Sequence, residues 1–457
     1  MKAERINTLQ ENNTHNTKLE SKIIRNIKTK LTDNSAMITQ ADKGNSIVIL
    51  PTEQYENKVE QFIQSNNFLT SKTNPTESFQ NQVWKVINNS KALIPQEEKW
   101  KHINLNPSTP SIKGLIKLHK PEHLIRPVVN WRGVPAYKLA QLFTKKIRII
   151  APLPHTYTIG NTRELSNKLE STPILPHHSL ASLDISSLYT NVPMRETRDI
   201  IANNLVKNGV DPQIRHELLN WYDTITQQNY FSNKEKIIIQ QESLVMGAPS
   251  SGLIAEFFLQ NLEDTHLTPL LDKHNISVYF RYVDDILIIF DSRDTEVVNI
   301  QEDFNMLHPN MKFTAELESN NQINFLDITI HKTPTKWTTS IYRKPSNSII
   351  SYSSNHPPQH KHATIRYLHN RLKTYHLQHE EYKEELDTIH DIMLNNGFPI
   401  HTHTHTHTDP TPQGSLLQLP ARNQVKLHTN GLPSRTLEEK TTFITNIFKK
   451  ADISITL

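Results

Sequence analysis

The sequence predicts an α+β fold in which antiparallel strands are accompanied by helices. Two apolar runs, 278–283 and 286–290, flank an acidic pair and are typical of the two buried strands of a hairpin. Residues 311–318 and 323–330 alternate apolar and polar side chains, which predicts another antiparallel pair. Apolar residues at helical spacing predict helices over 134–149, 195–228 and 253–262.

Composition sets the outer limits on the class of protein. The chain of 457 residues is long enough for about two or three domains or for one large enzyme of several parts. It contains no cysteine, which excludes disulfides, thiolate zinc sites and cysteine nucleophiles and favours an intracellular setting. The net charge of +4, with 24 histidines, is compatible with binding a polyanion. No run approaches the roughly 18 apolar residues of a membrane span, so we expect a soluble protein.

The N-terminal third begins with polar, Asn- and Lys-rich sequence. Apolar residues between Leu19 and Leu31 recur at weak helical spacing, which predicts one exposed helix. Residues 41–51 predict a turn followed by a short strand that ends at Pro51. A second helix is expected over 52–68.

A basic hairpin is predicted between residues 107 and 130. Its cations are Lys113, Lys117, His119, Lys120 and Arg126. Strands here would carry these side chains toward one face and form a cradle for phosphates. The alternative is an exposed edge hairpin on which lysines prevent strand pairing.

The first candidate acids are Asp284 and Asp285, at the junction of the two apolar runs. The turn lacks the Asn-Gly or Gly-Gly chemistry of a tight reversal. Two adjacent carboxylates repel each other, and a divalent metal would supply the counter-charge. They could also be ordinary turn acids. Asp184 ends another short strand, where it is either a third ligand or a helix cap.

A loop rich in Gly, Pro and Ser precedes the helix predicted at 253–262. Gly247 and Pro249 lie within it, and small residues before a helix N-terminus allow a backbone or ligand to approach closely. An ordinary cap loop would have the same composition.

These features suit one kind of chemistry when they are taken together. Polymerase-type phosphoryl transfer uses two divalent ions roughly 3.5–4 Å apart, held by oxygen ligands. One carboxylate at a strand end and an acidic pair on a neighbouring hairpin would hold them if the strands of Asp184 and Asp284–Asp285 pair. Arg126 would then meet a triphosphate.

The order of these motifs resembles that of reverse transcriptases. Leu183-Asp184 with Tyr189-Thr190-Asn191-Val192-Pro193 is similar to motif A, Met246-Gly247-Ala248-Pro249 to motif B, and Tyr282-Val283-Asp284-Asp285 to motif C. Residues 117–130 are similar to the fingers motif, residues 311–314 to motif D, and residues 323–327 to the primer-grip region. Met246 departs from the pattern, because other families often carry Gln before the Gly.

Within that superfamily the chain resembles the Penelope-like retroelements over about residues 36–375. The resemblance lies in Ala41-Asp42-Lys43-Gly44-Asn45, in 117–121, in 188–193 and in the basic run from Tyr342 to Lys361. The resemblance implies a right-hand fold with fingers, an antiparallel palm sheet and a helical thumb. It also implies RNA-directed DNA polymerase activity, with an RNA template, a DNA primer and deoxynucleoside triphosphates as partners. Telomerase catalytic subunits would be related proteins. Many relatives also carry a GIY-YIG endonuclease preceded by Cys and His residues, of which this sequence shows no sign. We therefore expect a member that extends existing 3′ ends, or a fragment of a longer element.

The resemblance also implies a role for the acids. Asp184 and Asp284 would hold two Mg²⁺ ions, with Mn²⁺ as the alternative. Asp285 would support them, and the Ile185 carbonyl would serve as a backbone ligand.

Roles in nucleotide binding are implied for six further residues. Tyr189 would exclude a 2′-hydroxyl, Arg126 would pair with the triphosphate together with Lys117 or Lys120, and Gly247 and Pro249 would shape the pocket. Lys312 is a weaker candidate for protonating the pyrophosphate.

The expected domain organisation follows from the same motifs. Residues 1–95 form an N-terminal helical extension, 96–180 the fingers, 181–330 the palm, 331–400 the primer grip and thumb, and 401–457 a His/Thr low-complexity linker and tail. The basic stretch 342–371 would grip the duplex, and one helix is expected from Ala363 to about Asn395. Action in the nucleus is expected because chromosomal DNA is the target. The alternatives are an inactive or domesticated RNA-binding protein with the same fold, and a metalloenzyme that does not act on nucleic acid.

Overall fold

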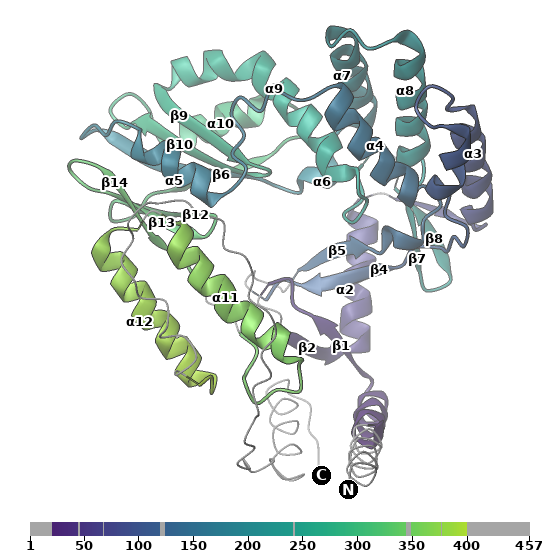
Figure 1. Ribbon diagram of the computed structural model, residues 1–457, viewed down its shortest axis with the longest axis horizontal. Coiled ribbons are helices and arrows are strands. Elements are labelled where there is room, and N and C mark those ends of the chain that lie inside the picture. The colour runs from purple at the N-terminus through teal and green to yellow at the C-terminus, as the bar shows by residue number, and fades with distance from the viewer. Residues whose placement is uncertain are drawn as a thin grey trace, which may run out of the picture.

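A four-stranded antiparallel sheet in the order β11-β6-β10-β9 carries the acidic motifs (Figure 1). The structure is a computed structural model, and it describes residues 21–399 except 44–45, 67, 119–123, 241–242, 344–348 and 376. The strands are β6 (His178–Ile185), β9 (Ile276–Tyr282), β10 (Asp285–Asp291) and β11 (Phe313–Leu317). The predicted hairpin is therefore present as β9–β10. The mixture of this sheet with helices confirms the α+β class.

Strand β10 is buried on both faces, which explains its continuous apolar run. Ile286, Ile288 and Phe290 belong to the main core, which includes α9 (Ser251–Lys273) and α10 (Val297–Met306). Leu287 and Ile289 belong to a second core on the other face, with α5 (Thr162–Glu170). Successive residues of a strand point to opposite faces, so one apolar run fills two cores.

The second predicted strand pair is wrong. Strand β11 pairs with β6. Residues 323–330 do not form one strand, because they belong to a hairpin of two strands, β12 (Gln322–Phe325) and β13 (Ile328–Lys332). The reversal falls at Leu326, whose φ of 55° is left-handed. Strand β14 (Trp337–Ile341) completes this three-stranded sheet. Alternation of period two identifies a strand but not its partner, and Leu326 gives no turn signal.

The basic hairpin is confirmed as β4 (Ile112–Ile116) and β5 (Ile125–Val129), which pair antiparallel. A second hairpin, β1 (Ala36–Gln40) and β2 (Ile47–Pro51), follows helical residues 21–33 and lies against it. Helix α2 (Thr52–Ser65) joins the two, because the Tyr55 hydroxyl accepts from the Gly114 amide at 2.8 Å.

The remaining elements form a helical part, most of which lies at the right of Figure 1. Its helices are α3 (Thr76–Asn89), η1 (Gln96–His102), η3 (Trp131–Gly133), α4 (Tyr137–Ile150), α6 (Leu188–Asn191), α7 (Met194–Lys207) and α8 (Pro212–Thr226), and its small sheet has the order β3 (Leu69–Ser71), β8 (Lys236–Ile239), β7 (Tyr230–Asn233). The stretch predicted as helical over 195–228 is thus divided, at Gly209 with a φ of 64°.

The single helix expected from Ala363 to Asn395 is wrong. The chain forms two helices, α11 (Pro358–Thr374) and α12 (His379–Asn395), with Tyr375 extended between them. Ile365, Leu368, Leu372, Ile389 and Met393 form a third core between the helices. One long helix would leave these apolar faces in water.

Several predictions fall outside the described residues. These are the N-terminal sequence before residue 21, Lys120, the run 344–348, the His/Thr repeat and the tail. The predicted domain boundaries stay predictions. In the described part of the chain, no helix is long and apolar enough to span a membrane.

The Gly/Pro loop is joined to the basic hairpin at Gly247. The Met246 carbonyl accepts from the Val129 amide at 3.0 Å. Gly247 has a φ of 124°, and a Cβ added there would lie 2.3 Å from the Val129 carbonyl oxygen. A side chain at this position would push the loop and β5 apart.

Gly247→Ala should therefore destabilise the protein more than Gly209→Ala. Both glycines have positive φ, which costs an L-residue about 1–2 kcal/mol, but nothing lies within 4 Å of a Cβ added at Gly209. Only Gly247→Ala adds a steric clash with the backbone. Urea denaturation of both variants measures the difference, and equal losses would contradict the close approach.

Candidate active site

A cleft of about 1740 Å³ contains the acidic motifs. Its described lining includes the hairpin β9–β10, the end of β6, parts of β5, β11, α2 and α5, the β12–β13 turn, the residues directly after β1 and the start of the segment that follows α11. The predicted site residues in it are Lys117, Arg126, Asp184, Ile185, Tyr189, Asp284 and Asp285. Segments more than 300 residues apart in sequence, from Asp42 to Tyr375, therefore meet in one space.

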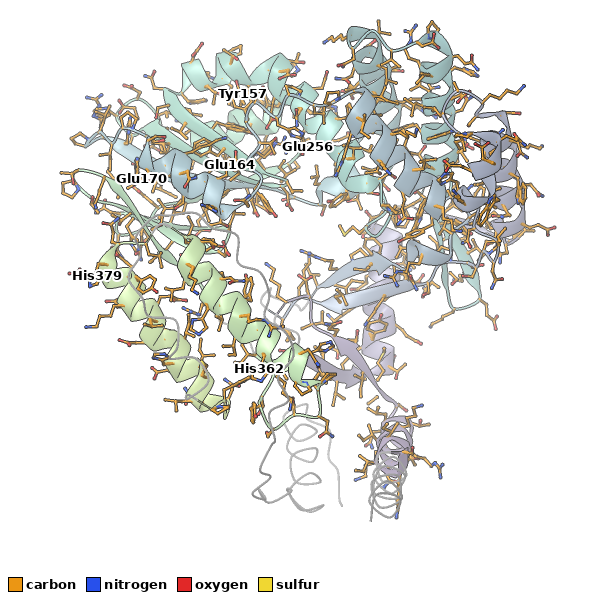
Figure 2. The ribbon with its side chains drawn as sticks, viewed as in Figure 1. Tyr157, Glu164, Glu170, Glu256, His362 and His379 are labelled. Atoms are coloured by element: carbon orange, nitrogen blue, oxygen red, sulfur yellow. The ribbon has the colours of Figure 1, made fainter. Side chains whose placement is uncertain are left out.

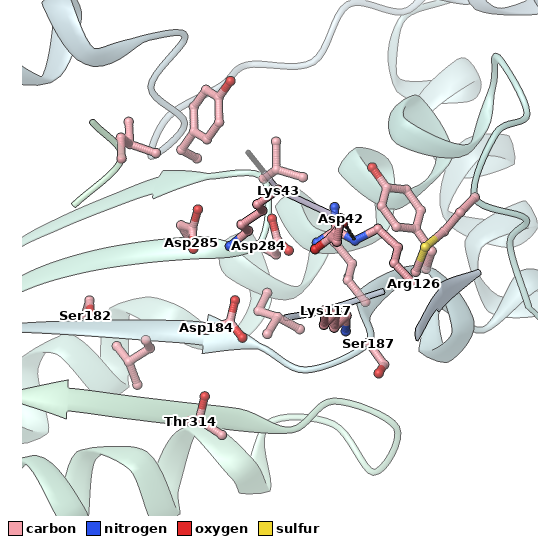
Figure 3. A pocket seen from close by; sticks show the side chains of 18 of the residues that line it. Asp42, Lys43, Lys117, Arg126, Ser182, Asp184, Ser187, Asp284, Asp285 and Thr314 are labelled. Carbon is pink, nitrogen blue, oxygen red and sulfur yellow. Dashed lines mark ion pairs between the residues drawn. The ribbon is translucent and has the colours of Figure 1, made fainter. Parts of the chain in front are cut away.

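The register of β6 and β10 brings the carboxylates together. Asp285 is directly opposite Asp184, and directly opposed residues carry their side chains on the same face. Asp284 occupies the turn, where its carbonyl accepts from the Ile185 amide at 3.0 Å. Figure 3 shows Asp184 and Asp284 beside the same space, with Asp285 farther along the hairpin. The expected pairing of the two strands is confirmed.

Carboxylate oxygens are the kind of donor that Mg²⁺ takes, so the residues present fit this ion. Among the described residues, no three His, Cys, Asp or Glu side chains form a ready-made ligand cluster. Magnesium typically takes one or two carboxylates and completes its octahedron with water and substrate phosphates. Asp184 is exposed and Asp284 is half-buried, so both can be reached by a substrate.

A buried ionic network supports the turn of the hairpin from behind. Arg281 is 1% exposed, and its guanidinium pairs with Glu263 at 2.5 Å and with Glu256 at 2.8 Å. Its Nη1 also donates to the Val283 carbonyl at 3.2 Å. Val283 has a φ of 56°, which is strained for a β-branched residue.

Glu256 is the acid of this network whose charge is best supported. Burial alone would raise its pKa, but hydrogen bonds from Arg281, Gln260 and Thr158 hold the pKa at about 2. Figure 2 shows Glu256 on α9 and Tyr157 on the neighbouring loop, on the side of the sheet away from α11. The network thus ties the helix that follows the Gly/Pro loop to the acidic turn.

Tyr189 lies between the acids and the Gly/Pro loop. Its carbonyl accepts from the Leu244 amide at 2.8 Å, and a Cβ added at Gly252 would lie 3.9 Å from its hydroxyl. Burial and then the charge of Asp284 raise its pKa, while Arg126 opposes the shift. The phenol is therefore neutral and within electrostatic reach of both groups.

Arg126 contacts a carboxylate that the sequence did not predict. Its Nε lies 3.0 Å from Asp42 Oδ1, and Asp42 and Lys43 both line the cleft. The stretch Ala41-Asp42-Lys43-Gly44-Asn45 carries part of the family resemblance, but it was assigned no role in the site.

The structure does not bring every predicted residue into the cleft. Met246 lines it, whereas Gly247 and Pro249 are not among its described lining residues. Lys312 is exposed and also lies outside that lining; its carbonyl accepts from the Ser186 amide. Asp327 and Tyr375 line the cleft but were not predicted as site residues.

Asp327 connects the β12–β13 turn to α11. Its carboxylate accepts from the Tyr375 hydroxyl at 2.5 Å and lies 3.4 Å from Arg371 Nε. Its carbonyl accepts from Arg371 Nη2 at 2.9 Å. The predicted primer grip and the predicted thumb are therefore held together by a charged contact.

Comparison with known proteins agrees with this geometry. Residues 118–321, which are less than half of the chain, match the family model for the reverse transcriptase (RNA-dependent DNA polymerase). Residues 348–408 match the model for an animal helix-turn-helix domain. No curated protein matches the chain in sequence.

The fold resembles that of a solved telomerase, and two further polymerase structures are similar to a lesser extent. Telomerase from Candida albicans, in complex with a fragment of telomeric RNA, has a TM-score of 0.52 at 10% identity over 79% of this chain and 63% of that one. Telomerase from Candida tropicalis has a TM-score of 0.48 at 12% identity, over 78% and 59%. The RNA-dependent RNA polymerase of a human picobirnavirus has 0.46 at 11%, over 83% and 80%. The chain thus spans less than two thirds of the length of either telomerase chain.

The predicted right-hand polymerase fold with an antiparallel palm sheet is confirmed. The domain at 118–321 is that of an RNA-directed DNA polymerase, and it contains every predicted acid. Residues 118–321 thus match the reverse transcriptase family, and the chain has the fold of a polymerase.

Proposed function

We propose that this chain is the reverse transcriptase of a Penelope-like retroelement, which adds deoxynucleotides to a primer 3′ end by two-metal nucleotidyl transfer. The observation that carries the proposal is the pairing of Asp184 with Asp285 beside Asp284, in a cleft that also contains Arg126 and Lys117. Carboxylates on one side and cations on the other are what a metal-bound triphosphate requires.

In this proposal the acids hold the metals and the chain positions the reactants. Asp184 and Asp284 are the ligands, Asp285 is a supporting acid, and the Ile185 carbonyl is available as a backbone ligand. Bound Mg²⁺ would lower the pKa of the primer hydroxyl and neutralise the triphosphate. The primer 3′-oxygen bonds to the α-phosphorus, and the bond to pyrophosphate breaks.

Other residues of the cleft bind the nucleotide. Arg126 is about half-exposed and can reach the triphosphate, with Lys117 beside it. Tyr189 would lie under the sugar and exclude a 2′-hydroxyl. Lys312 would have to approach from outside the described cleft lining, which makes it a weak candidate for the general acid.

Helix α11 is suited to hold the template–primer duplex. From Ala363 onward its exposed residues recur at helical spacing and form one stripe: Ala363, Arg366, Tyr367, Asn370, Lys373 and Thr374. Thr374 lines the cleft, so the stripe leads into it. The helix has four Lys or Arg and no acid, whereas α12 has six acids and one Lys. In many helix-turn-helix proteins the second helix reads DNA, but here the charges assign backbone contact to the first.

The Penelope-like assignment rests on the motifs quoted above and on the likeness of the fold to telomerase. With this assignment we propose that the protein copies an RNA template, extends a DNA primer with deoxynucleoside triphosphates and acts in the nucleus.

Replacement of one acid tests the proposal. Asp284→Asn should abolish primer extension in Mg²⁺ or Mn²⁺ while leaving thermal unfolding cooperative, because it removes a ligand charge at a half-buried turn. Asp264→Asn, on an exposed part of α9, is the matched control and should remain active. Chelation of divalent metal should stop the wild type. A wild type that binds RNA but extends no primer in either metal would instead select the inactive RNA-binding protein.

Tyr189→Ala should admit ribonucleotides. Removing the ring opens the space that a 2′-hydroxyl would occupy, so the ratio of kcat/KM for dNTP over NTP should fall by about 10-fold or more. Single-nucleotide extension with both substrates measures the ratio. Unchanged discrimination would assign the exclusion to another residue.

Removal of the charges on α11 should weaken duplex binding in a salt-dependent way. For Arg366→Gln with Lys373→Gln, the slope of log K against log salt should fall by about 0.9 for each phosphate that the helix no longer neutralises. Lys383→Gln, exposed on α12, is the control. Fluorescence anisotropy between low and physiological salt gives the slopes, and equally weakened binding by the control would contradict the assignment to α11.

A further inference from the structure

We propose that Asp42 is a positioning residue of the nucleotide site, which holds the Arg126 guanidinium toward the triphosphate. The inference rests on the proposed function. It extends the site to the loop after β1, which lies outside the matched segment 118–321.

The backbone fixes Ala41 and Asp42, directly after β1, against the basic hairpin. The Asp42 amide donates to the Ile116 carbonyl at 2.8 Å, and Ala41 forms a parallel bridge with Ile116. The Thr39 hydroxyl donates to the Gly114 carbonyl at 3.2 Å. Asp42 therefore has a defined place relative to β4 and β5, and does not depend on Arg126 for it.

The ion pair has one buried and one exposed member. The Asp42 side chain is 2% exposed, while that of Arg126 is 48% exposed. Figure 3 shows the pair at the edge of the cleft, on the side facing Asp284. The carboxylate thus lies beneath the arginine and leaves the solvent side of the guanidinium facing the cleft.

The contact is made through Nε, at 3.0 Å from Oδ1. In a planar guanidinium held at Nε, the outer edge between the two terminal amino groups stays free, and this edge can take a phosphate in the bidentate geometry that arginine favours. A flexible arginine would lose rotamer freedom when it binds substrate. Pairing with Asp42 imposes that order before the nucleotide arrives.

The surroundings of Asp42 are unusual for a purely structural acid. Its Oδ2 is buried and has no hydrogen-bond partner among the described residues. A buried carboxylate with an unpaired oxygen is costly, and a stability role would be served better by an apolar residue. The arrangement is consistent with an acid retained to orient its arginine.

The test separates nucleotide binding from folding and from duplex binding. Asp42→Asn keeps the shape of the side chain and removes its charge, so KM for dNTP should rise by roughly 2- to 10-fold, while kcat and the Kd for template–primer stay within about 2-fold. Asp33→Asn, exposed in the N-terminal helical residues, should behave as wild type.

A double-mutant cycle identifies the partner. In an Arg126→Ala background, Asp42→Asn should raise KM no further, because the group that it orients is gone. Arg126→Lys keeps the charge on an exposed side chain but lacks Nε, and should raise KM to the same extent as Asp42→Asn. If Asp42→Asn unfolds, the KM of Arg126→Lys for dNTP tests the inference in its place.

Each outcome decides the question. A wild type that extends no primer overturns the proposed function and the inference with it. An active wild type overturns the inference alone if KM for dNTP is unchanged in Asp42→Asn and Arg126→Lys, or if the effects of Asp42→Asn and Arg126→Ala add.

Discussion

The pairing of β10 with β6 in a single register is the constraint on which the site depends. A slip of one residue would turn Asp285 away from Asp184, because side chains alternate between the faces of a strand. Such a slip would also exchange the cores in which the two fully buried residues pack. Ile288 would leave the main core, and Leu287 would leave the second core on the other face of the sheet. The apolar strand therefore fixes the position of Asp284 and Asp285, which lie directly before its apolar run. Packing energy far from the cleft determines the geometry inside it.

The acidic turn is the place where local sequence preference is overruled. Val283 adopts a left-handed conformation that costs a β-branched residue more than glycine, and Arg281 donates to its carbonyl from a buried position. Two glutamates surround that arginine, so the network retains a negative charge behind the turn unless one acid takes a proton. A tight Asn-Gly turn would relieve the strain but would remove the acid from the tip.

The sequence allowed prediction of elements with a strong local signal. The hairpins β4–β5 and β9–β10 and the meeting of Asp184 with Asp284 and Asp285 follow from apolar runs, charge and motif order. It did not allow prediction of partners set by packing alone: β11 pairs with β6 across more than 100 residues, and α11 and α12 form a pair because their apolar faces need each other. Leu326 and Tyr375, where the chain turns, carry none of the usual turn chemistry.

Asp42 was missed for a related reason. An aspartate in a turn is ordinary, and its partner Arg126 lies more than 80 residues away on a strand that has its own cations. The bridge between Ala41 and Ile116 and the hydrogen bond from Thr39 to the Gly114 carbonyl show that the β1–β2 hairpin packs beside the basic hairpin. If the fingers are built from both hairpins, the segment 118–321 contains the acids proposed to bind metal, whereas the carboxylate that pairs with its Arg126 lies before it. The N-terminal residues would then belong to the enzyme as much as the palm does.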